Sequence, residues 1–428
     1  MSQVSFADRT LSLWKWAVLA APLWWVLGLN LLIYQSVAVF LFLRMAICYQ
    51  HEDQGIYLPA PCFFIFSLIL LYFFSIVIHA SSFPAARVVA SFYNLTYWIM
   101  GFLIMVILAN AFRIQKTSFF LGAFNSLAWM MGILGAVMSL AAWAGGHTVL
   151  FPTPLSGLSR AFENADLLPQ SVNVYLLIED WFASTFRLRF NVFSPYPTAT
   201  GGLLMMALMM ITTWAALNKK LKSPFFISLF ALNFLALLMT LSRMSILVGV
   251  LSVSVVFLLQ KKKALPWVVL LILVVALATP WILKATNVIW GLRQDSSETR
   301  FALYRYSLQQ LQGVDWILGL GIKDRGGAFI FPIGSHSTYV SLCVKTGILG
   351  LSTFVLFQAT LLLRWFHLRD FAMREAGAFY LWRGLGWVFI AMMIWTMTED
   401  IDAPQLVAFL YFSLVGVFEG MRRELLAR

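Results

Sequence analysis

Residues Gly291–Arg300 read GLRQDSSETR, and they lead through Arg305, Gly319 and Gly321 to the sequence GSHSTY at Gly334–Tyr339. This polar stretch interrupts a chain that is otherwise mostly apolar. Two arginines lie close together in it, and a histidine stands just before an apolar run long enough to begin a membrane helix. We interpret this polar segment as the functional site, located at one membrane face. The apolar remainder of the chain would form the helical bundle that supports it.

The composition indicates an integral membrane protein. The chain has 428 residues, of which 61% are hydrophobic and 11% are charged, and its mean hydropathy is +0.84. Soluble domains carry about 25% charged residues. Apolar runs of roughly 18 or more residues recur, each long enough to cross a hydrocarbon core of about 30 Å. These runs are continuous rather than alternating with a period of two, so they predict helices rather than barrel strands.

We predict an all-α fold, a polytopic membrane bundle of about twelve transmembrane helices that forms a single domain over residues 1–428. The first two spans form either one kinked segment or a tight hairpin around Leu29-Asn30. Lys15 precedes a long apolar stretch without a small-residue cleavage pattern, so we expect the first helix to be retained. The spans are expected near 17–31, 32–47, 61–79, 89–112, 118–143, 198–217, 223–241, 244–260, 265–284, 337–363, 380–397 and 404–420.

Basic clusters determine the predicted orientation. The lysines within 219–222 and 261–263 abut apolar runs, as the positive-inside rule expects of cytoplasmic loops. This distribution accounts for the net charge of +12 without a nucleic-acid partner. Both chain ends are then cytoplasmic, and parity places 144–197, 285–336 and 398–403 on the outer, periplasmic side.

Two outer loops, 144–197 and 285–336, are too long to serve only as connectors. We expect both to contain short helices, and Val172–Phe186 in the first loop is interpreted as an amphipathic helix lying on the membrane. Arg189 in the same loop is a candidate supporting residue of the site. The three scattered cysteines suggest neither a disulfide framework nor a metal site.

Arg243 stands between two apolar runs at the predicted outer end of a short hairpin. An arginine at such a position costs free energy unless it meets an anion or an aqueous cavity. One interpretation is a side chain that reaches to lipid headgroups or forms a structural ion pair. The other is a ligand for a phosphate-bearing substrate, because the guanidinium fork binds phosphate oxygens in bidentate geometry.

Arg300 and Arg305 belong to a segment that predicts a short amphipathic helix, with Ser297 or Thr299 as its N-cap. Arg300 is then near the positive end of the helix dipole, a location that favours anions. Arg305 lies five residues further on, on a neighbouring face. The alternative for each arginine is a solvated loop charge.

His336 precedes an apolar run and has no acidic residue, cysteine or second histidine near it in sequence, so metal binding has little support. A neutral imidazole at the outer membrane face can act as a general base near neutral pH. The alternative is a histidine that caps a helix or packs in the protein.

Glu399, Asp400 and Asp402 form an acidic cluster just before Pro404. These carboxylates can hold the arginines in place, orient His336, or bind a cation or sugar hydroxyls. The alternative is a solvated outer turn.

Several short motifs follow one another over about residues 240–352. They are Leu241-Ser242-Arg243, Ser297-Glu298-Thr299-Arg300 with its following helix, Gly319-Leu320-Gly321, the GSHSTY sequence, and KTGILG at Lys345–Gly350. In this order they resemble the O-antigen ligase and O-antigen polymerase superfamily, and we take 240–352, including the loop 285–336, as the ligase/polymerase-like core. The family pattern usually places Asn after the histidine, where this chain has Ser337.

The resemblance implies a metal-independent glycosyltransferase without a cofactor, embedded in the bacterial inner membrane with its active site on the periplasmic side. Its donor would be a glycan linked to undecaprenyl diphosphate. Arg243 and Arg300 would clamp the diphosphate, with Arg305 as a further ligand, and His336 would be the catalytic base. Direct displacement by an acceptor hydroxyl predicts inversion at the anomeric carbon.

The identity of the acceptor distinguishes two possible activities. A lipid-linked glycan acceptor makes the protein a polymerase of O-antigen or another surface polysaccharide, and a lipid A-core acceptor makes it an O-antigen ligase. We favour the polymerase, because no feature demands a lipid A-core acceptor. A hypothesis of a different class is a transporter or flippase of lipid-linked sugars, but such proteins often show two related halves, and no internal repeat is visible here. The other expected partners are membrane lipids, and no nucleic acid is expected.

Overall fold

The computed structural model describes residues 3–51, 55–158, 168–180, 188–260, 294–324, 331–403 and 405–428. The predicted span 265–284 and the lysines within 261–263 lie outside these residues. Side chains are described for the same ranges except at 3–5, 51, 294–297 and 405.

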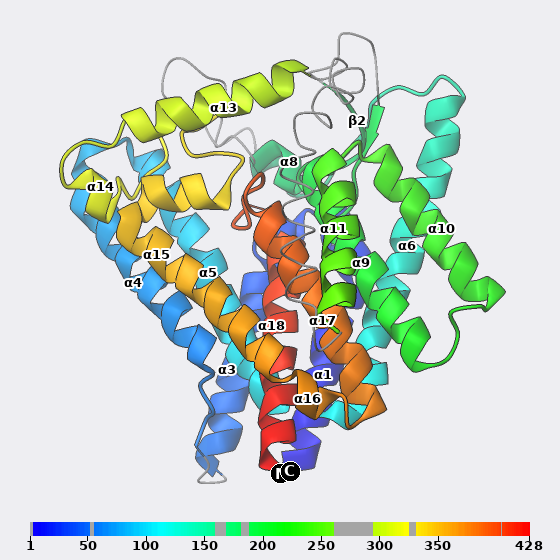
Figure 1. The fold of residues 1–428 in the computed structure, drawn as a ribbon. Coiled ribbons are helices and arrows are strands. Elements are labelled where there is room, and N and C mark those ends of the chain that lie inside the picture. Colours follow the sequence, from blue (N-terminus) through cyan, green and yellow to red (C-terminus); the bar gives the residue numbers. More distant parts are fainter. Residues whose placement is uncertain are drawn as a thin grey trace.

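The described chain is mostly helical, and its elements follow in one series (Figure 1). The first part contains α1 (Gln3–Leu19), α2 (Ala21–Val26), η1 (Leu29–Leu31), α3 (Ile33–His51), α4 (Ala60–His79), η2 (Ala80–Ser82), α5 (Ala85–Ala111), η3 (Ile114–Lys116) and α6 (Thr117–Trp143). The middle part contains β1 (Val149–Pro152), α8 (Leu168–Val172), β2 (Asn173–Glu179), β3 (Leu188–Phe190), α9 (Pro197–Leu217), α10 (Pro224–Met239) and α11 (Arg243–Leu259). The last part contains α13 (Gln294–Gln309), α14 (Asp315–Leu318), α15 (Thr338–His367), α16 (Arg369–Ala372), α17 (Ala376–Trp395) and α18 (Gln405–Ala427).

Seven of the described helices, α3, α4, α5, α6, α9, α15 and α17, are long and apolar enough to cross a membrane. The shorter helices α10 and α11 are also apolar. From 61–79 onward, each predicted span that falls on described residues coincides with one of the helices. The prediction of a helical fold with several candidate membrane spans is therefore confirmed, whereas the number of about twelve spans stays a prediction.

The break between the first two predicted spans lies at Gly28 and η1. Gly28 has φ 75°, a left-handed conformation that favours glycine, and a Cβ at this position would lie 2.9 Å from the Val172 carbonyl oxygen. The chain then turns back, so that α1 and α3 pack against one another. Of the two predicted alternatives, the hairpin is correct.

The described chain is mostly helical, as predicted, but the loop 144–197 also contains a small antiparallel sheet of order β1-β2-β3. In its register Leu150 pairs with Tyr175, and Ile178 pairs with Arg189. The predicted amphipathic helix at Val172–Phe186 is therefore wrong over the strand β2. The segment NVYLLIE is rich in β-branched and aromatic residues, and pairing with strands on both sides satisfies its backbone.

The described parts of the two long loops lie at the same end of the bundle. Figure 1 shows α8, β2, α13 and α14 at that end, and α16 with both chain termini at the opposite end. Helix α9 leads away from the sheet and α10 returns to it, so the lysines of 219–222 lie away from the sheet. This sidedness agrees with the predicted grouping of the loops, and the compartment that each end faces stays a prediction.

Helix α15 is broken at Gly347, where the backbone adopts φ 62° and ψ −163°. The Leu320 N–H donates to the Val344 carbonyl at 2.7 Å, and the Gly321 N–H donates to the Lys345 carbonyl at 3.0 Å. A Cβ on Gly319 would lie 2.3 Å from the Thr346 nitrogen, so only glycine allows this close approach. The segment Gly319-Leu320-Gly321 thereby satisfies carbonyls that the break exposes, and residues 338–346 form a short half-helix at the loop end of the bundle.

Candidate active site

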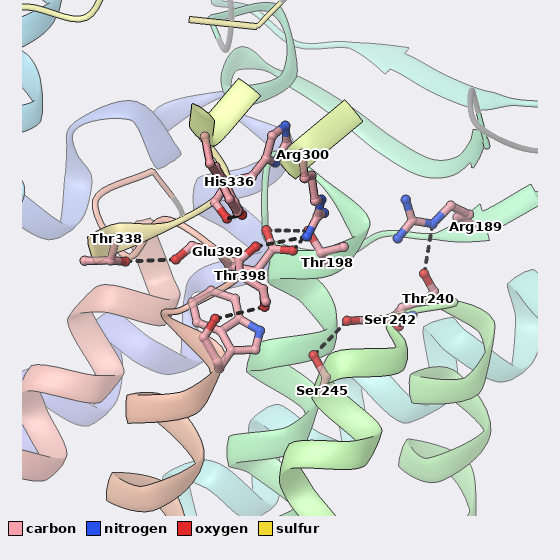
Figure 2. Close-up of polar contacts among 12 residues, drawn as sticks. Arg189, Thr198, Thr240, Ser242, Ser245, Arg300, His336, Thr338, Thr398 and Glu399 are labelled. Atoms are coloured by element: carbon pink, nitrogen blue, oxygen red, sulfur yellow. Dashed lines mark hydrogen bonds and ion pairs between the residues drawn. The ribbon is translucent and has the colours of Figure 1, made fainter. Parts of the chain in front are cut away.

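Arg300 and Glu399 form an ion pair at the loop end of the bundle (Figure 2). The Arg300 Nη2 lies 3.1 Å from the Glu399 Oε1, and the Arg300 Nη1 donates to the Thr398 carbonyl at 3.0 Å. The Glu399 side chain is 3% exposed and that of Arg300 is 23% exposed. Arg300 comes from α13, and Glu399 comes from the connection between α17 and α18. The pair therefore joins the second long loop to the last two helices.

Two threonines hold Glu399 in place. The Thr198 hydroxyl, in the first turn of α9, donates to the Glu399 Oε2 at 2.9 Å. The Thr338 hydroxyl, at the start of α15, donates to the Glu399 carbonyl at 2.8 Å. Burial raises the pKa of the Glu399 carboxyl, although Arg300 and Thr198 act in the opposite direction. Glu399 thus fixes Arg300 relative to α9 and α15.

One face of α13 holds both Arg300 and the loop that carries His336. Tyr304, one turn after Arg300, donates its hydroxyl hydrogen to the His336 carbonyl. Ser307 lies on the next turn, and its hydroxyl oxygen accepts from the Gly334 N–H at 2.8 Å. Because residues four apart lie on the same helix face, α13 sets the position of His336 relative to Arg300.

His336 has φ 66°, and Figure 2 shows its imidazole beside the Arg300 side chain. The next residue, Ser337, is the N-cap of α15, and its hydroxyl accepts from the Val340 N–H at 3.3 Å. The serine that departs from the usual family pattern therefore has a structural role as a helix cap.

Burial, together with the positive charges of Arg300 and Lys323, lowers the pKa of His336 from 6.5 to about 3. The imidazole is therefore neutral at pH 7, and one ring nitrogen can accept a proton or a hydrogen bond. The Phe331 ring meets it edge-on, with 4.7 Å between ring centroids.

Arg189 adds a further guanidinium within electrostatic range of Glu399. It lies in β3, is buried, and donates its Nε–H to the Thr240 carbonyl at 3.0 Å. Its charge acts to lower the pKa of Glu399, which places it within electrostatic range of the Arg300 pair. The predicted supporting residue thus lies at the site.

Arg243 is the first residue of α11, and its side chain is partly buried. Its neighbour Ser242 packs against Gly201, where a Cβ would lie 2.6 Å from the Ser242 Cβ. Gly201 lies three residues after Thr198 in α9, and Thr198 bonds Glu399. The start of α9 therefore lies between the start of α11 and the Arg300 pair.

Arg305 is separated from this group. Its side chain is exposed, and five residues of helix rotate it by about 140° from Arg300. The structure gives it no contact with His336 or Glu399 among the described residues, so its predicted role as a diphosphate ligand stays a prediction.

The acidic cluster is a set of buried ion pairs, so the alternative of a solvated turn is wrong. Asp400 pairs with the Lys323 Nζ at 2.9 Å, and Asp402 pairs with the Lys345 Nζ at 2.5 Å. Burial raises the pKa of Asp400. Burial also acts to raise the pKa of Asp402, but Lys345 and Lys323 outweigh it and lower that pKa. The ion pairs of the three carboxylates therefore link α13, the 319–324 segment and α15 to the short connection between α17 and α18.

Lys323 and Lys345 are site residues that the sequence did not predict. The signal for Lys345 was available, because a lysine inside an apolar run requires a partner or an aqueous cavity. Its partner could not be named, since Asp402 is 57 positions away in the chain. Lys323 could not be predicted, because it follows Gly319 and Gly321 in a polar segment and no motif around it indicates a buried ion pair.

Within the described residues, no group of three or more His, Cys, Asp or Glu side chains is arranged to hold a metal ion. The independence from metal stays a prediction.

Residues 226–355 match the family model described as O-antigen ligase. This region is similar to the O-antigen ligase family. It contains Arg300 and His336, which Figure 2 shows beside one another, and Arg243, the first residue of α11. No curated protein matches the chain.

The matched region, residues 226–355, does not include all of the site. Arg189 precedes it, and Glu399, Asp400 and Asp402 follow it. The ion pairs of these carboxylates link the matched region to the last two helices, so the site depends on segments on both sides of it.

Proposed function

We propose that the protein transfers a glycan from undecaprenyl diphosphate to an acceptor hydroxyl at the periplasmic face of the inner membrane. The observation that supports this most is the placement of Arg300 and His336 by one face of α13, within the region that matches the O-antigen ligase family. A cation for the leaving group and a neutral base for the acceptor are then side by side.

Arg300 binds the diphosphate in this proposal. A guanidinium has five N–H donors, and the structure uses two Arg300 donors for Thr398 and Glu399. The remaining donors can bond phosphate oxygens while Glu399 keeps the fork oriented. Arg243 contributes from the first turn of α11, where the helix dipole favours anions. These charges stabilise the negative charge that grows on the diphosphate as the glycosidic bond breaks.

His336 is the general base in this proposal. Its imidazole takes the proton from the acceptor hydroxyl as that oxygen attacks the anomeric carbon, and the bond from this carbon to the diphosphate oxygen breaks. Attack opposite the leaving group inverts the configuration. A base with a pKa of about 3 is weak in the free protein. The bound diphosphate brings negative charge next to the imidazole, which raises the pKa towards the working pH.

The assay uses the purified full-length protein in detergent with a lipid-linked oligosaccharide. New glycosidic bonds, with release of the lipid diphosphate, are the expected result. Translocation of the lipid in vesicles without any new bond would contradict the proposal and favour the transporter class.

The acceptor is tested in cells. The same residues serve polymerisation and ligation, and the family description names the ligase. A deletion strain with lipid A-core carrying one repeat unit has lost a polymerase. A strain that accumulates polymer on its lipid carrier has lost a ligase.

A further inference from the structure

Arg383 lies inside the candidate span Ala376–Trp395, far from the candidate active site along α17. It is seven residues into the helix, or about 10 Å from its start. That start adjoins α16, at the end of the bundle that holds both chain termini (Figure 1). An ionisable residue in a membrane span is costly unless it has a partner or a function.

Three aromatic rings of the same helix surround the Arg383 guanidinium. Its central carbon is 5.6 Å from the ring centroid of Phe379, 5.2 Å from that of Tyr380 and 5.2 Å from that of Trp387. These cation–π contacts fix the orientation of the guanidinium without neutralising its charge. No carboxylate of the described residues forms an ion pair with it.

Two hydrogen-bond donors are left unpaired at this place. The Arg383 Nε and the Trp387 Nε1 are both buried, and neither has an acceptor among the described residues. Buried donors without acceptors are rare in native proteins, so the pair indicates a missing acceptor. Both groups only donate, so the missing partner is an acceptor, and the positive charge selects an anion.

We propose that Arg383, framed by Tyr380 and Trp387, binds the phosphate group of an anionic membrane phospholipid. The guanidinium fork matches phosphate oxygens, and the location near one end of a span is the depth of a headgroup that the side chain can reach. This site lies at the end opposite to Arg300 and does not depend on the proposed glycan transfer.

The test measures lipid retention by native mass spectrometry on the full-length protein in mixed micelles that contain phosphatidylglycerol or phosphatidylcholine. Wild type is expected to retain phosphatidylglycerol at least ten times more strongly than Arg383→Gln. The matched control is Arg374→Gln, which removes an exposed arginine that lies 5.2 Å from one ring, that of Phe371. This control is expected to retain the lipid as wild type does.

A second variant keeps the test valid if Arg383→Gln does not fold. Trp387→Phe keeps an aromatic ring and removes the indole N–H, and it is expected to weaken retention several-fold with an unchanged thermal midpoint in phosphatidylcholine. Equal retention of phosphatidylglycerol by wild type and these variants would overturn the proposal. A thermal shift produced by inorganic phosphate alone would assign the site to a soluble anion and overturn the lipid assignment.

Discussion

Arg300 places its Nη2 3.1 Å from the Glu399 Oε1, although the two residues are 99 positions apart in the chain. The carboxylate is buried, and its other oxygen accepts from Thr198. The guanidinium therefore has a fixed orientation before any substrate arrives, which is what electrostatic stabilisation of a transition state requires. The proposed role of Arg300 and the stability of the fold both depend on this pair, so variants must separate the two effects.

Arg300→Gln leaves the Glu399 carboxylate buried without its cation, which is expected to destabilise the protein by roughly 1–3 kcal/mol. The double variant Arg300→Gln with Glu399→Gln removes both charges, so most of that stability should return. Glycan transfer should stay reduced by roughly 10²–10³-fold in both, because the diphosphate loses its cation. Thermal midpoints and transfer assays on purified protein separate the two effects. Wild-type transfer by the double variant would rule out Arg300 as a diphosphate ligand.

His336→Asn tests the base. Asn tolerates the left-handed conformation that position 336 adopts, and the backbone carbonyl that binds Tyr304 is kept. The fold should therefore survive, while transfer falls by roughly 10²–10⁴-fold because no base accepts the proton. Transfer is measured with lipid-linked oligosaccharide at saturating concentration. A variant that retains wild-type turnover would show that His336 only shapes the loop.

The lowered pKa of His336 predicts the direction in which stability changes with pH. His336 has a pKa of about 3 in the folded protein and 6.5 as its ordinary value, so between these values the unfolded chain binds a proton that the folded chain does not. Stability then falls as the pH falls from about 6.5 towards 3, by up to about 1.4 kcal/mol per pH unit. The thermal midpoint of wild type should therefore drop faster with falling pH than that of His336→Asn. Parallel curves would mean that the histidine ionises normally.

The sequence singled out candidate residues, but it did not predict the contacts between them. Arg300 and His336 could be singled out because charged and polar side chains in an apolar chain are costly unless they have a partner or a function. In the structure Arg300 belongs to α13, and Tyr304 of the same helix bonds the His336 carbonyl. The pairing of Lys345 with Asp402 could not be predicted, because tertiary packing brings these distant residues together. The strand β2 was mistaken for a helix because a short apolar run with polar flanks fits both periods, and only its neighbouring strands decide between them.

Gly347→Ala is expected to disrupt the break in α15. The position has φ 62°, and a Cβ there would lie 2.2 Å from the Ile317 carbonyl carbon, so the protein should lose more than about 1 kcal/mol of stability. The control is Gly122→Ala in α6, where a Cβ meets nothing within 4 Å and should stabilise the helix by roughly 0.5–1 kcal/mol. Thermal unfolding of both variants in the same detergent checks this. Similar midpoints for the two variants would show that the break is not required.

Lys345 and Asp402 offer the sharpest test of the buried connections. The Lys345 side chain is fully buried, and Asp402 also accepts from the Trp98 indole N–H at 3.3 Å. Lys345→Met leaves a buried carboxylate unpaired, which is expected to cost roughly 3–5 kcal/mol. Adding Asp402→Asn removes that charge while an amide oxygen still accepts from Trp98, so the double variant should be more stable than Lys345→Met alone. Thermal midpoints that fall additively in the double variant would show that the two residues act independently, and the connection after α17 would then need another anchor.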